Sequence, residues 1–181
     1  MVVLRPLLVI VGPTAVGKTA LSVRLAEALG GEIVSADSRQ VYAGMDIGTA
    51  KPTAEERARV PHHLLDVVTP DQTLSVAEYQ ALAYAAIAAV HGRRRVPLLV
   101  GGSGQYVRAV LEGWRVPAVA PDWGLRASLA AEAEADGVLA LHNRLQAIDP
   151  EAAARIDARN VRRVIRALEV HAVTGQPISQ L

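Results

Sequence analysis

The sequence predicts an α/β fold, in which a parallel β-sheet is flanked by helices and joined by a helical insertion or appendage. Up to about Pro117, short apolar runs alternate with helical patterns, which is the order that parallel strands with crossover helices require. Beyond Pro117 the strand-like runs end. The sequence there is typical of Ala-rich helices broken at Asp122, Gly137 and Asp149-Pro150.

Three apolar runs predict buried parallel strands, at residues 7–11, 33–36 and 97–100. The segment HHLLDVV is a candidate for a fourth strand. Its adjacent residues His62 and His63 would point to opposite sides of a strand and lack an obvious third ligand. We therefore do not expect a metal site at these histidines.

Two helices are predicted between the strands. The first covers Thr19–Leu29 and stops at Gly30, because glycine adopts the left-handed conformation that ends many helices. The second covers residues 75–92 and opens with a capping box from Ser75 to Glu78.

The segment GPTAVGKT matches the phosphate-binding loop pattern G-x-x-x-x-G-K-[ST] at every position. It follows a predicted strand and opens a predicted helix, which is the context that this motif needs. Backbone N–H groups of such a loop form a cradle for anions, Lys18 adds a compact positive charge, and the Thr19 hydroxyl can ligate Mg²⁺. The residues predicted to bind a diphosphate or nucleotide are Gly12, Pro13, Thr14, Ala15, Val16, Gly17, Lys18 and Thr19. The core is therefore expected to be P-loop NTPase-like.

Two further loops follow the other predicted strands, SADSRQVY and GGSGQY. Ligands of parallel sheets bind beyond the carboxyl ends of the strands, so we expect these loops to meet the phosphate-binding loop in one active site. Asp37 is a candidate metal ligand, general base, or cap of a following turn or helix. The residues Gly101–Gly104 either allow close backbone approach around the Ser103 hydroxyl or form a tight strand–helix turn. The third strand ends without an acid, so nucleoside triphosphate hydrolysis is poorly supported.

Composition narrows the class of protein. Hydrophobic residues make up 51% and charged residues 20%, which is typical of a globular protein and excludes a disordered one. The absence of cysteine excludes disulfides, thiolate metal sites and cysteine nucleophiles. The apolar runs are far shorter than the ~20 residues that span a bilayer, and no leader pattern is present. We expect a cytoplasmic protein that does not bind membranes.

Arginines gather near the end of the chain, whose formal net charge is only +1. On one continuous helix they would form a stripe about 100° wide, opposite an apolar side that includes Leu168. The five arginines are Arg155, Arg159, Arg162, Arg163 and Arg166. Such a stripe suits a phosphate backbone, but it is also typical of a solvated amphipathic helix. If Asn160 capped a new helix, Arg155 and Arg159 would leave the stripe.

Several of these segments together resemble the tRNA dimethylallyltransferase family, also called the tRNA isopentenyltransferase family. The segments are GPTAVGKT, SADSRQVYAGMDIGTAKP, HHLLDVV, GGSGQYVRAVLEG and RNVRRVIRALEV…TGQP. The resemblance runs through nearly the whole chain, whereas family members are typically longer and continue beyond its C-terminal end. It implies transfer of a dimethylallyl group from dimethylallyl diphosphate to the exocyclic amine of the tRNA adenine just 3′ of the anticodon. It also implies that the phosphate-binding loop grips the departing diphosphate, with Mg²⁺ assisting.

The resemblance assigns roles to individual residues. Asp37 would be the general base, Ser103, where the family usually has Thr, would orient the attacking amine, and Lys18 would stabilise the leaving group. The residues implied to contact the tRNA anticodon stem-loop are Asp37, Ser38, Arg39, Gln40, Ser103, Arg126, Arg162, Arg163, Val164, Ile165 and Arg166. We expect a monomer with three parts: a core at 1–117, a partial tRNA-binding insertion at 118–160, and a helix at 161–181 that returns to the core.

Two other functions are compatible with parts of this pattern. A P-loop kinase for a small molecule would share the phosphate-binding loop and use ATP, but the turn after the third strand and the stretch GMDIGTAKP have no obvious role in a kinase. A non-catalytic RNA-binding protein would retain the basic residues without turnover. Comparing the affinities for dimethylallyl diphosphate and for ATP distinguishes the transferase from the kinase. Substitution of Asp37 distinguishes the transferase from the non-catalytic RNA-binding protein.

Overall fold

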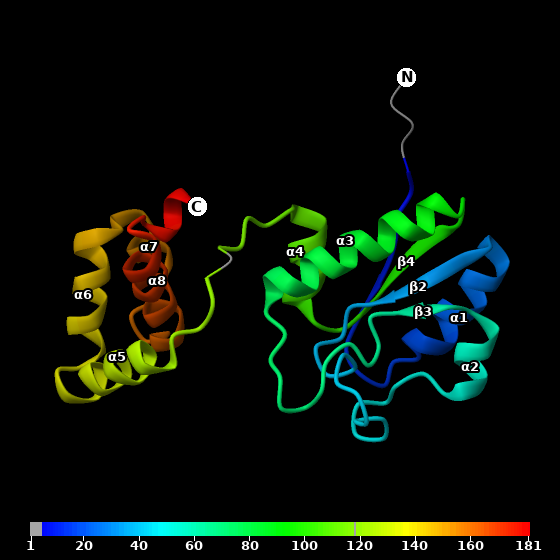
Figure 1. Cartoon of the computed structure of the whole chain (residues 1–181), viewed down its shortest axis with the longest axis horizontal. Coiled ribbons are helices and arrows are strands. Elements are labelled where there is room, and N and C mark those ends of the chain that lie inside the picture. Colours follow the sequence, from blue (N-terminus) through cyan, green and yellow to red (C-terminus); the bar gives the residue numbers. More distant parts are fainter. Residues whose placement is uncertain (1–4, 118) are drawn as a thin grey trace. The chain divides into compact units, whose positions relative to one another are not determined.

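The protein, described by a computed structural model, forms two compact units, the first ending at Trp114 and the second beginning at Arg115 (Figure 1). The structure describes residues 5–117 and 119–181. Within these residues, no helix combines the length and the apolar character needed to cross a bilayer.

The first unit is built on a four-stranded sheet in which all pairings are parallel and the strand order is β1-β4-β2-β3. The strands are β1 (Leu8–Val11), β2 (Gly31–Ser35), β3 (His62–His63) and β4 (Val96–Gly101). The α/β fold and its parallel sheet are thus confirmed, and β3 forms inside the segment HHLLDVV. It is short, pairing only Ile33 and Val34 of β2 with His62 and His63.

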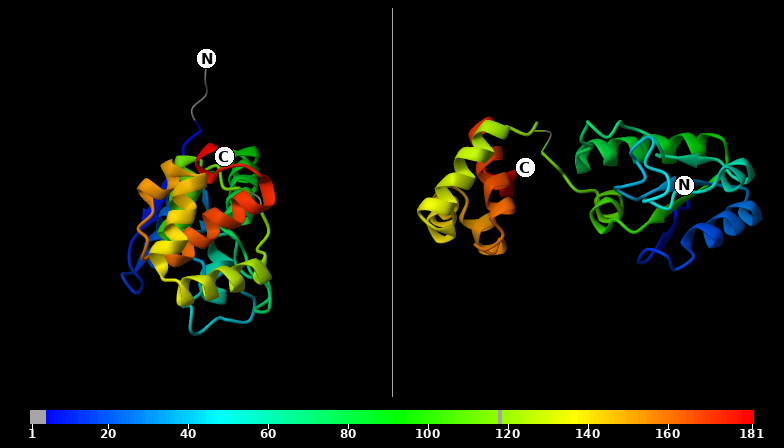
Figure 2. Two further views of the ribbon diagram at one scale, coloured as in Figure 1. Left: turned by 90° about the vertical axis from the view of Figure 1, so that its left-hand side faces the viewer. Right: turned by 90° about the horizontal axis from the view of Figure 1, so that it is seen from below.

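Helices cover both faces of this sheet, as the right-hand view of Figure 2 shows. They are α1 (Lys18–Leu29), α2 (Ala54–Arg59), α3 (Val76–Gly92) and α4 (Gly104–Glu112). Successive strand residues point to opposite faces, so Ile33 packs with the cluster on the α1 side and Val34 with the cluster on the side of α3 and α4. Burial on both faces explains why the strands are continuous apolar runs.

The predicted helix boundaries in this unit are confirmed. Gly30 takes the left-handed conformation, with φ of 60°, and ends α1. At the start of α3, Ser75 accepts a hydrogen bond from the Glu78 N–H while the Glu78 carboxylate accepts one from the Ser75 N–H. The capping box therefore exists as predicted.

The second unit is helical among its described residues. It contains α5 (Trp123–Ala135), α6 (Val138–Ile148), α7 (Pro150–Arg155), α8 (Val161–Thr174) and the 3-10 helix η1 (Ile178–Gln180). Asp122, Gly137 and Asp149 are the N-cap residues of α5, α6 and α7, so the predicted breaks are confirmed.

Helix α8 packs inside the helical unit. Its buried residues Val164 and Leu168 join Leu129 of α5 and Leu141 and Leu145 of α6 in one apolar cluster. The apolar face of α8 is thus covered by helices of its own unit, and the expected return of residues 161–181 to the core stays a prediction. The division between the two compact units falls after Trp114, and the sequence analysis expected the core to end at residue 117.

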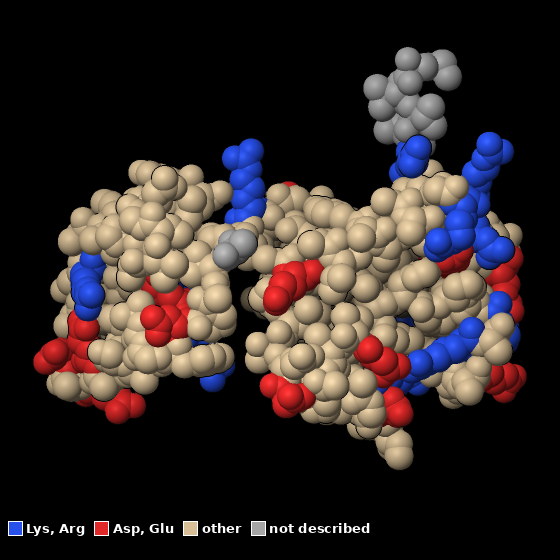
Figure 3. All heavy atoms as spheres, viewed as in Figure 1, with Lys and Arg blue, Asp and Glu red and all other residues tan. Residues whose placement is uncertain are grey.

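The basic stripe is not one continuous helix. Helix α7 ends at Arg155, and the Asn160 side chain caps α8 by accepting from the Arg163 N–H at 3.4 Å. The alternative in which Asn160 begins a new helix is therefore confirmed, and Arg155 and Arg159 lie outside α8. In Figure 3, acidic and basic side chains are interspersed on the face shown of each unit.

Candidate functional site

Three loops follow the carboxyl ends of β1, β2 and β4 and meet at one edge of the sheet. The Ser103 N–H donates to the Ala36 carbonyl at 3.1 Å. The Ser38 N–H donates to the Ser103 hydroxyl at 2.7 Å, and that hydroxyl donates to the Ser38 hydroxyl at 3.0 Å. The loops after β2 and β4 are therefore hydrogen-bonded to each other, as the sheet topology led us to expect.

The Ser103 hydroxyl serves this contact between loops and not its own helix. Ser103 is the N-cap residue of α4, a position at which a serine hydroxyl usually accepts from the first helical turn, yet it makes no such bond. Its oxygen points instead to Ser38, one residue after Asp37. The hydroxyl predicted to orient the attacking amine is thus held at the edge of the sheet where the three loops meet.

Glycines at the end of β4 allow backbone segments to approach closely. A Cβ added at Gly101 would lie 2.1 Å from the Ala36 carbonyl oxygen, and one added at Gly102 would lie 3.2 Å from the Gly12 carbonyl oxygen. Gly102 therefore lies against the phosphate-binding loop, and the close-approach interpretation of this turn holds. A cavity of about 330 Å³ opens between these two segments, and its lining residues are Val11, Gly12, Pro13, Gly101, Gly102, Gly104, Val107 and Arg108.

The phosphate-binding loop leads into α1 through Gly17, whose φ of 84° is readily adopted only by glycine. No side chain caps this helix N-terminus. The Lys18 ammonium donates to the Pro13 carbonyl, so it folds back over the loop. Within residues 5–117 and 119–181, Lys18 makes no ion pair with an acid. The first turn of α1 thus presents N–H groups and a positive charge together, which suits an anion.

Asp37 lies directly beyond β2, and its side chain is half-buried. Its Oδ1 oxygen accepts from the Arg39 N–H at 2.9 Å, which closes a turn over Ser38. The residue therefore has the turn-forming role that was one of its three candidate roles. Among the described residues, no group of three or more His, Asp or Glu side chains is placed to hold a metal ion.

The stretch GMDIGTAKP forms an ordered loop beside the same edge. Gln40 donates to the Thr49 and Ala50 carbonyls at 3.3 and 3.2 Å. The buried Lys51 ammonium donates to the Tyr42 carbonyl and pairs with Asp46 and Asp66. Burial alone would lower the pKa of Lys51, but its hydrogen bonds to the two carboxylates raise it overall.

Sequence reasoning missed Lys51, which holds this loop together. The available signal was that it is one of only two lysines in a chain whose other basic residues are arginines. A compact ammonium can donate to three separate oxygens in a small space, which a planar guanidinium does less readily.

In the helical unit, two arginines expected to contact tRNA hold one buried carboxylate. Arg126 binds both oxygens of Glu169 at 2.8 Å, and Arg166 binds one at 2.6 Å. The Asp122 N–H adds a further hydrogen bond to Glu169. Burial would raise the pKa of Glu169, but the two arginines more than offset that effect and lower it to about 2. Sequence reasoning missed Glu169, although an acid within the apolar run of α8 was a signal.

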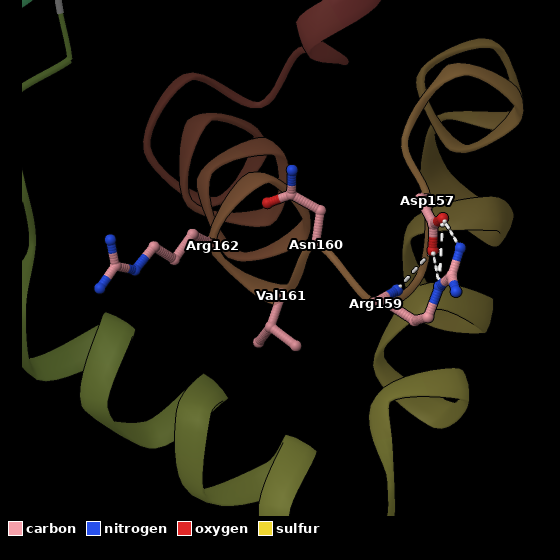
Figure 4. A pocket seen from close by; sticks show the side chains of 5 residues that line it. All are labelled: Asp157, Arg159, Asn160, Val161 and Arg162. Atoms are coloured by element: carbon pink, nitrogen blue, oxygen red, sulfur yellow. Dashed lines mark hydrogen bonds and ion pairs between the residues drawn. The ribbon is translucent and has the colours of Figure 1, made fainter.

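The remaining residues expected to bind tRNA lie on both sides of α8. Arg162 and Arg163 are exposed, whereas Val164 is fully buried and Ile165 is nearly so. Arg162 lies beside a shallow hollow whose other lining residues are Asp157, Arg159, Asn160 and Val161. Figure 4 shows Arg159 turned onto Asp157 while Arg162 extends away from that pair.

Comparison with known proteins identifies the family. The family described as IPP transferase matches residues 40–181. The chain belongs to this family. It is 65% identical over 178 residues to a tRNA dimethylallyltransferase of Herpetosiphon aurantiacus, covering 98% of this chain and 56% of the relative. It is 53% identical to that of Thermomicrobium roseum, with 98% and 54% covered. These alignments include the phosphate-binding loop, which lies before the part matched by the family.

Solved structures give the same result. The full-length tRNA isopentenylpyrophosphate transferase of Bacillus halodurans is 53% identical, with a TM-score of 0.62 over 96% of this chain and 57% of that one. A eukaryotic dimethylallyltransferase, described as acting on tRNA, is 30% identical with a TM-score of 0.81 over 98% of this chain and 44% of that one. The chain thus spans a little over half the length of the curated relatives named above.

Proposed function

We propose that this protein transfers a dimethylallyl group from dimethylallyl diphosphate to the exocyclic amine of the adenine just 3′ of the anticodon in tRNA. The observation that carries the proposal is the joining of three loops at one sheet edge, where Ser103 links the β4 loop to the β2 loop and Gly102 lies against Gly12. Membership of the family supports prenyl transfer over the kinase alternative.

In the proposed reaction, the amine nitrogen attacks C1 of the dimethylallyl group. A carbon–nitrogen bond forms, the carbon–oxygen bond to diphosphate breaks, and its electron pair leaves with the diphosphate. Asp37 takes the proton that the amine loses, a role that contributes roughly 10²–10⁴-fold in rate. The Ser103 hydroxyl accepts a hydrogen bond from the amine N–H and orients the amine before attack, which leaves the nitrogen lone pair free to attack.

The leaving diphosphate gains negative charge as the bond breaks. Lys18 and the N–H groups of the loop at residues 12–19 would stabilise that charge, since both already lie at the start of α1. Mg²⁺ suits the available donors, because it is usually held by few protein oxygens together with substrate phosphates, and Thr19 offers one hydroxyl there. When bound, the ion would neutralise part of the diphosphate charge.

The proposed RNA partner is the anticodon stem-loop. Residues Asp37 to Gln40 would face the inserted adenine, and Arg126 and the segment Arg162–Arg166 would face the RNA backbone. Of this segment, Val164 and Ile165 are buried and would hold the arginines in place, while Arg162 and Arg163 are exposed to reach phosphates. The proposal retains the monomeric state and cytoplasmic location expected from the sequence.

Calorimetric titration of the protein with dimethylallyl diphosphate and with ATP, each with Mg²⁺, tests this proposal. We expect the prenyl diphosphate to bind more tightly and Lys18→Ala to weaken it roughly 10- to 100-fold, the loss of a charge-assisted hydrogen bond. Arg24→Gln, on the exposed side of α1, is the matched control and should change little. Preferred binding of ATP would overturn prenyl transfer in favour of the kinase.

A further inference from the structure

Helices α5 and α8 form a hollow that combines an exposed indole with arginines. Its volume is about 550 Å³, within the range of small-ligand sites. Its lining residues are Trp123, Arg126, Ala130, Arg162, Ile165 and Arg166. On α5 they are spaced by three and four residues, and on α8 both Ile165 and Arg166 lie three or four residues after Arg162, so one face of α5 meets one face of α8. None of these six residues is acidic.

Trp123 is unusually open for its type, with 65% of its surface exposed. Large aromatic side chains are buried on average. An exposed indole beside cations is therefore a candidate contact for a binding partner. The Arg126 guanidinium lies 5.0 Å from the centre of the Trp123 ring. The indole is therefore held on one side by a cation while much of its surface remains accessible.

The cation over Trp123 is itself fixed. Arg126 binds both oxygens of the fully buried Glu169, which α8 contributes. Because the guanidinium cannot swing freely, the indole that it contacts is restrained too, and less side-chain entropy is lost when a ligand binds. Glu169 neutralises only one of Arg126 and Arg166, and Arg162 makes no ion pair among the described residues. The hollow therefore keeps a positive charge beside the ring.

We infer that this hollow binds an unpaired nucleotide of RNA, with the base stacked on Trp123 and the adjoining phosphate on Arg162. Stacking on an aromatic ring together with a nearby cation is the usual means of holding single-stranded nucleic acid. The inference rests on the proposed function, which supplies an RNA partner with an unpaired loop. It adds a stacking subsite in the helical unit to the loops of the α/β unit that would hold the reacting adenine.

Fluorescence of Trp123 tests this inference. The Trp114→Phe variant leaves Trp123 as the single tryptophan, and Trp114 lies in the other unit. We expect an RNA hairpin with an unpaired loop to quench Trp123 fluorescence at saturation. A blunt RNA duplex of equal length and inorganic triphosphate should not quench, because they offer charge without an unpaired base.

Binding measurements with substituted proteins complete the test. Trp123→Ala should weaken hairpin binding roughly 5- to 150-fold, whereas Trp123→Phe, which keeps a stacking surface, should weaken it about 2-fold or less. Arg162→Gln should weaken binding more at low salt than at high salt, and Arg155→Gln, whose side chain pairs with Glu151, is the control. Circular dichroism confirms that each variant is folded.

The outcomes separate this inference from the proposed function. Unchanged hairpin affinity in Trp123→Ala would overturn the stacking subsite while leaving the proposed transferase intact. Quenching by an acidic peptide but not by the hairpin would overturn it in favour of a protein partner. If the hairpin binds no variant although dimethylallyl diphosphate still binds, both the subsite and the RNA partner of the proposed function are wrong.

Discussion

The two units of this protein position their functional side chains in different ways. In the α/β unit the course of the backbone positions them, because the parallel strands end at one edge of the sheet. Hydrogen bonds such as that from the Ser38 N–H to the Ser103 hydroxyl then hold the loops together. In the helical unit, ion pairs between side chains and Glu169 position them. A site built by backbone topology can be located from motifs, whereas a site built by ion pairs depends on which helices happen to pack.

The difference also decides what arginines do. In the helical unit, Arg126 and Arg166 share one buried carboxylate, that of Glu169. Part of their positive charge is therefore neutralised inside the protein and is not available to a ligand. Arg155 and Arg159 pair with acids on their own segments. Only Arg162 and Arg163 remain exposed and unpaired among the described arginines of the former stripe, so counting arginines in the sequence overstates the positive charge that is available to RNA.

The largest effect should come from Asp37→Asn, in the backbone-built site. The proton acceptor would be lost while the turn to the Arg39 N–H survives through the amide oxygen. We expect transfer to an anticodon stem-loop to slow roughly 10²–10⁴-fold, with the affinity for dimethylallyl diphosphate unchanged. Single-turnover assays with labelled prenyl diphosphate measure this.

The exposed residue Asp71 provides the matched control, since Asp71→Asn makes the same chemical change outside the three loops that follow β1, β2 and β4. An unchanged rate in Asp37→Asn would remove Asp37 from the mechanism. Stem-loop binding without any transfer by the unsubstituted protein would instead support the non-catalytic RNA-binding alternative.

The sequence predicted the strands and two of the four helices of the α/β unit, α1 and α3, because the signals for these elements are local. The pattern GPTAVGKT, the apolar runs and the Ser75–Glu78 box each involve adjacent residues, and parallel topology then brings the strand ends together. The strand with the weakest signal in the sequence was β3. It has only two residues, and they are defined as a strand by their pairing with β2.

The helical unit was predicted in its boundaries but not in its packing. Local cap signals at Asp122, Gly137 and Asp149 located the helices, yet nothing local says that α8 buries Glu169 against α5. The partner of a buried charge lies 43 residues away in sequence, so only the folded structure reveals it. The stacking role of Trp123 was hidden for the same reason.

The second-largest effect tests this ion-paired centre. Glu169→Gln leaves Arg126 and Arg166 without their carboxylate, and we expect the free energy of unfolding of the helical unit to fall by about 3 kcal/mol at neutral pH. Urea denaturation in the Trp114→Phe protein, followed by Trp123 fluorescence, reports on this unit. Glu151→Gln, which breaks an exposed pair with Arg155, should cost about 0.5 kcal/mol or less.

The same variant has a characteristic pH dependence. Because the folded pKa of Glu169 is lowered from 4.5 to about 2, its stabilisation is fully present above pH 4.5 and is lost as the pH falls from 4.5 towards 2. We expect the unsubstituted protein and Glu169→Gln to differ most above pH 4.5 and to converge near pH 2. A constant difference across that range would mean that the carboxylate charge does not stabilise the unit.

A third comparison tests close backbone approach in the α/β unit. Gly101→Ala would place a methyl group 2.1 Å from the Ala36 carbonyl oxygen, so the β2 and β4 loops must separate. We expect a loss of about 3 kcal/mol in the free energy of unfolding and weaker binding of the diphosphate. Gly104→Ala, whose added methyl meets nothing within 4 Å, should be neutral or slightly stabilising. Equal effects of the two substitutions would contradict the role assigned to the glycine turn.

The smallest effects compare one helix cap from each unit. Ser75→Ala removes one half of the reciprocal capping box of α3 and should cost about 1 kcal/mol. Asn160→Ala should cost about 0.5 kcal/mol or less, because the bond from the Arg163 N–H is 3.4 Å long, beyond the usual range for a strong hydrogen bond. Chemical denaturation of both variants measures the difference. A larger loss for Asn160→Ala would mean that this cap, and not only the Glu169 ion pairs, fixes the direction in which α8 presents Arg162.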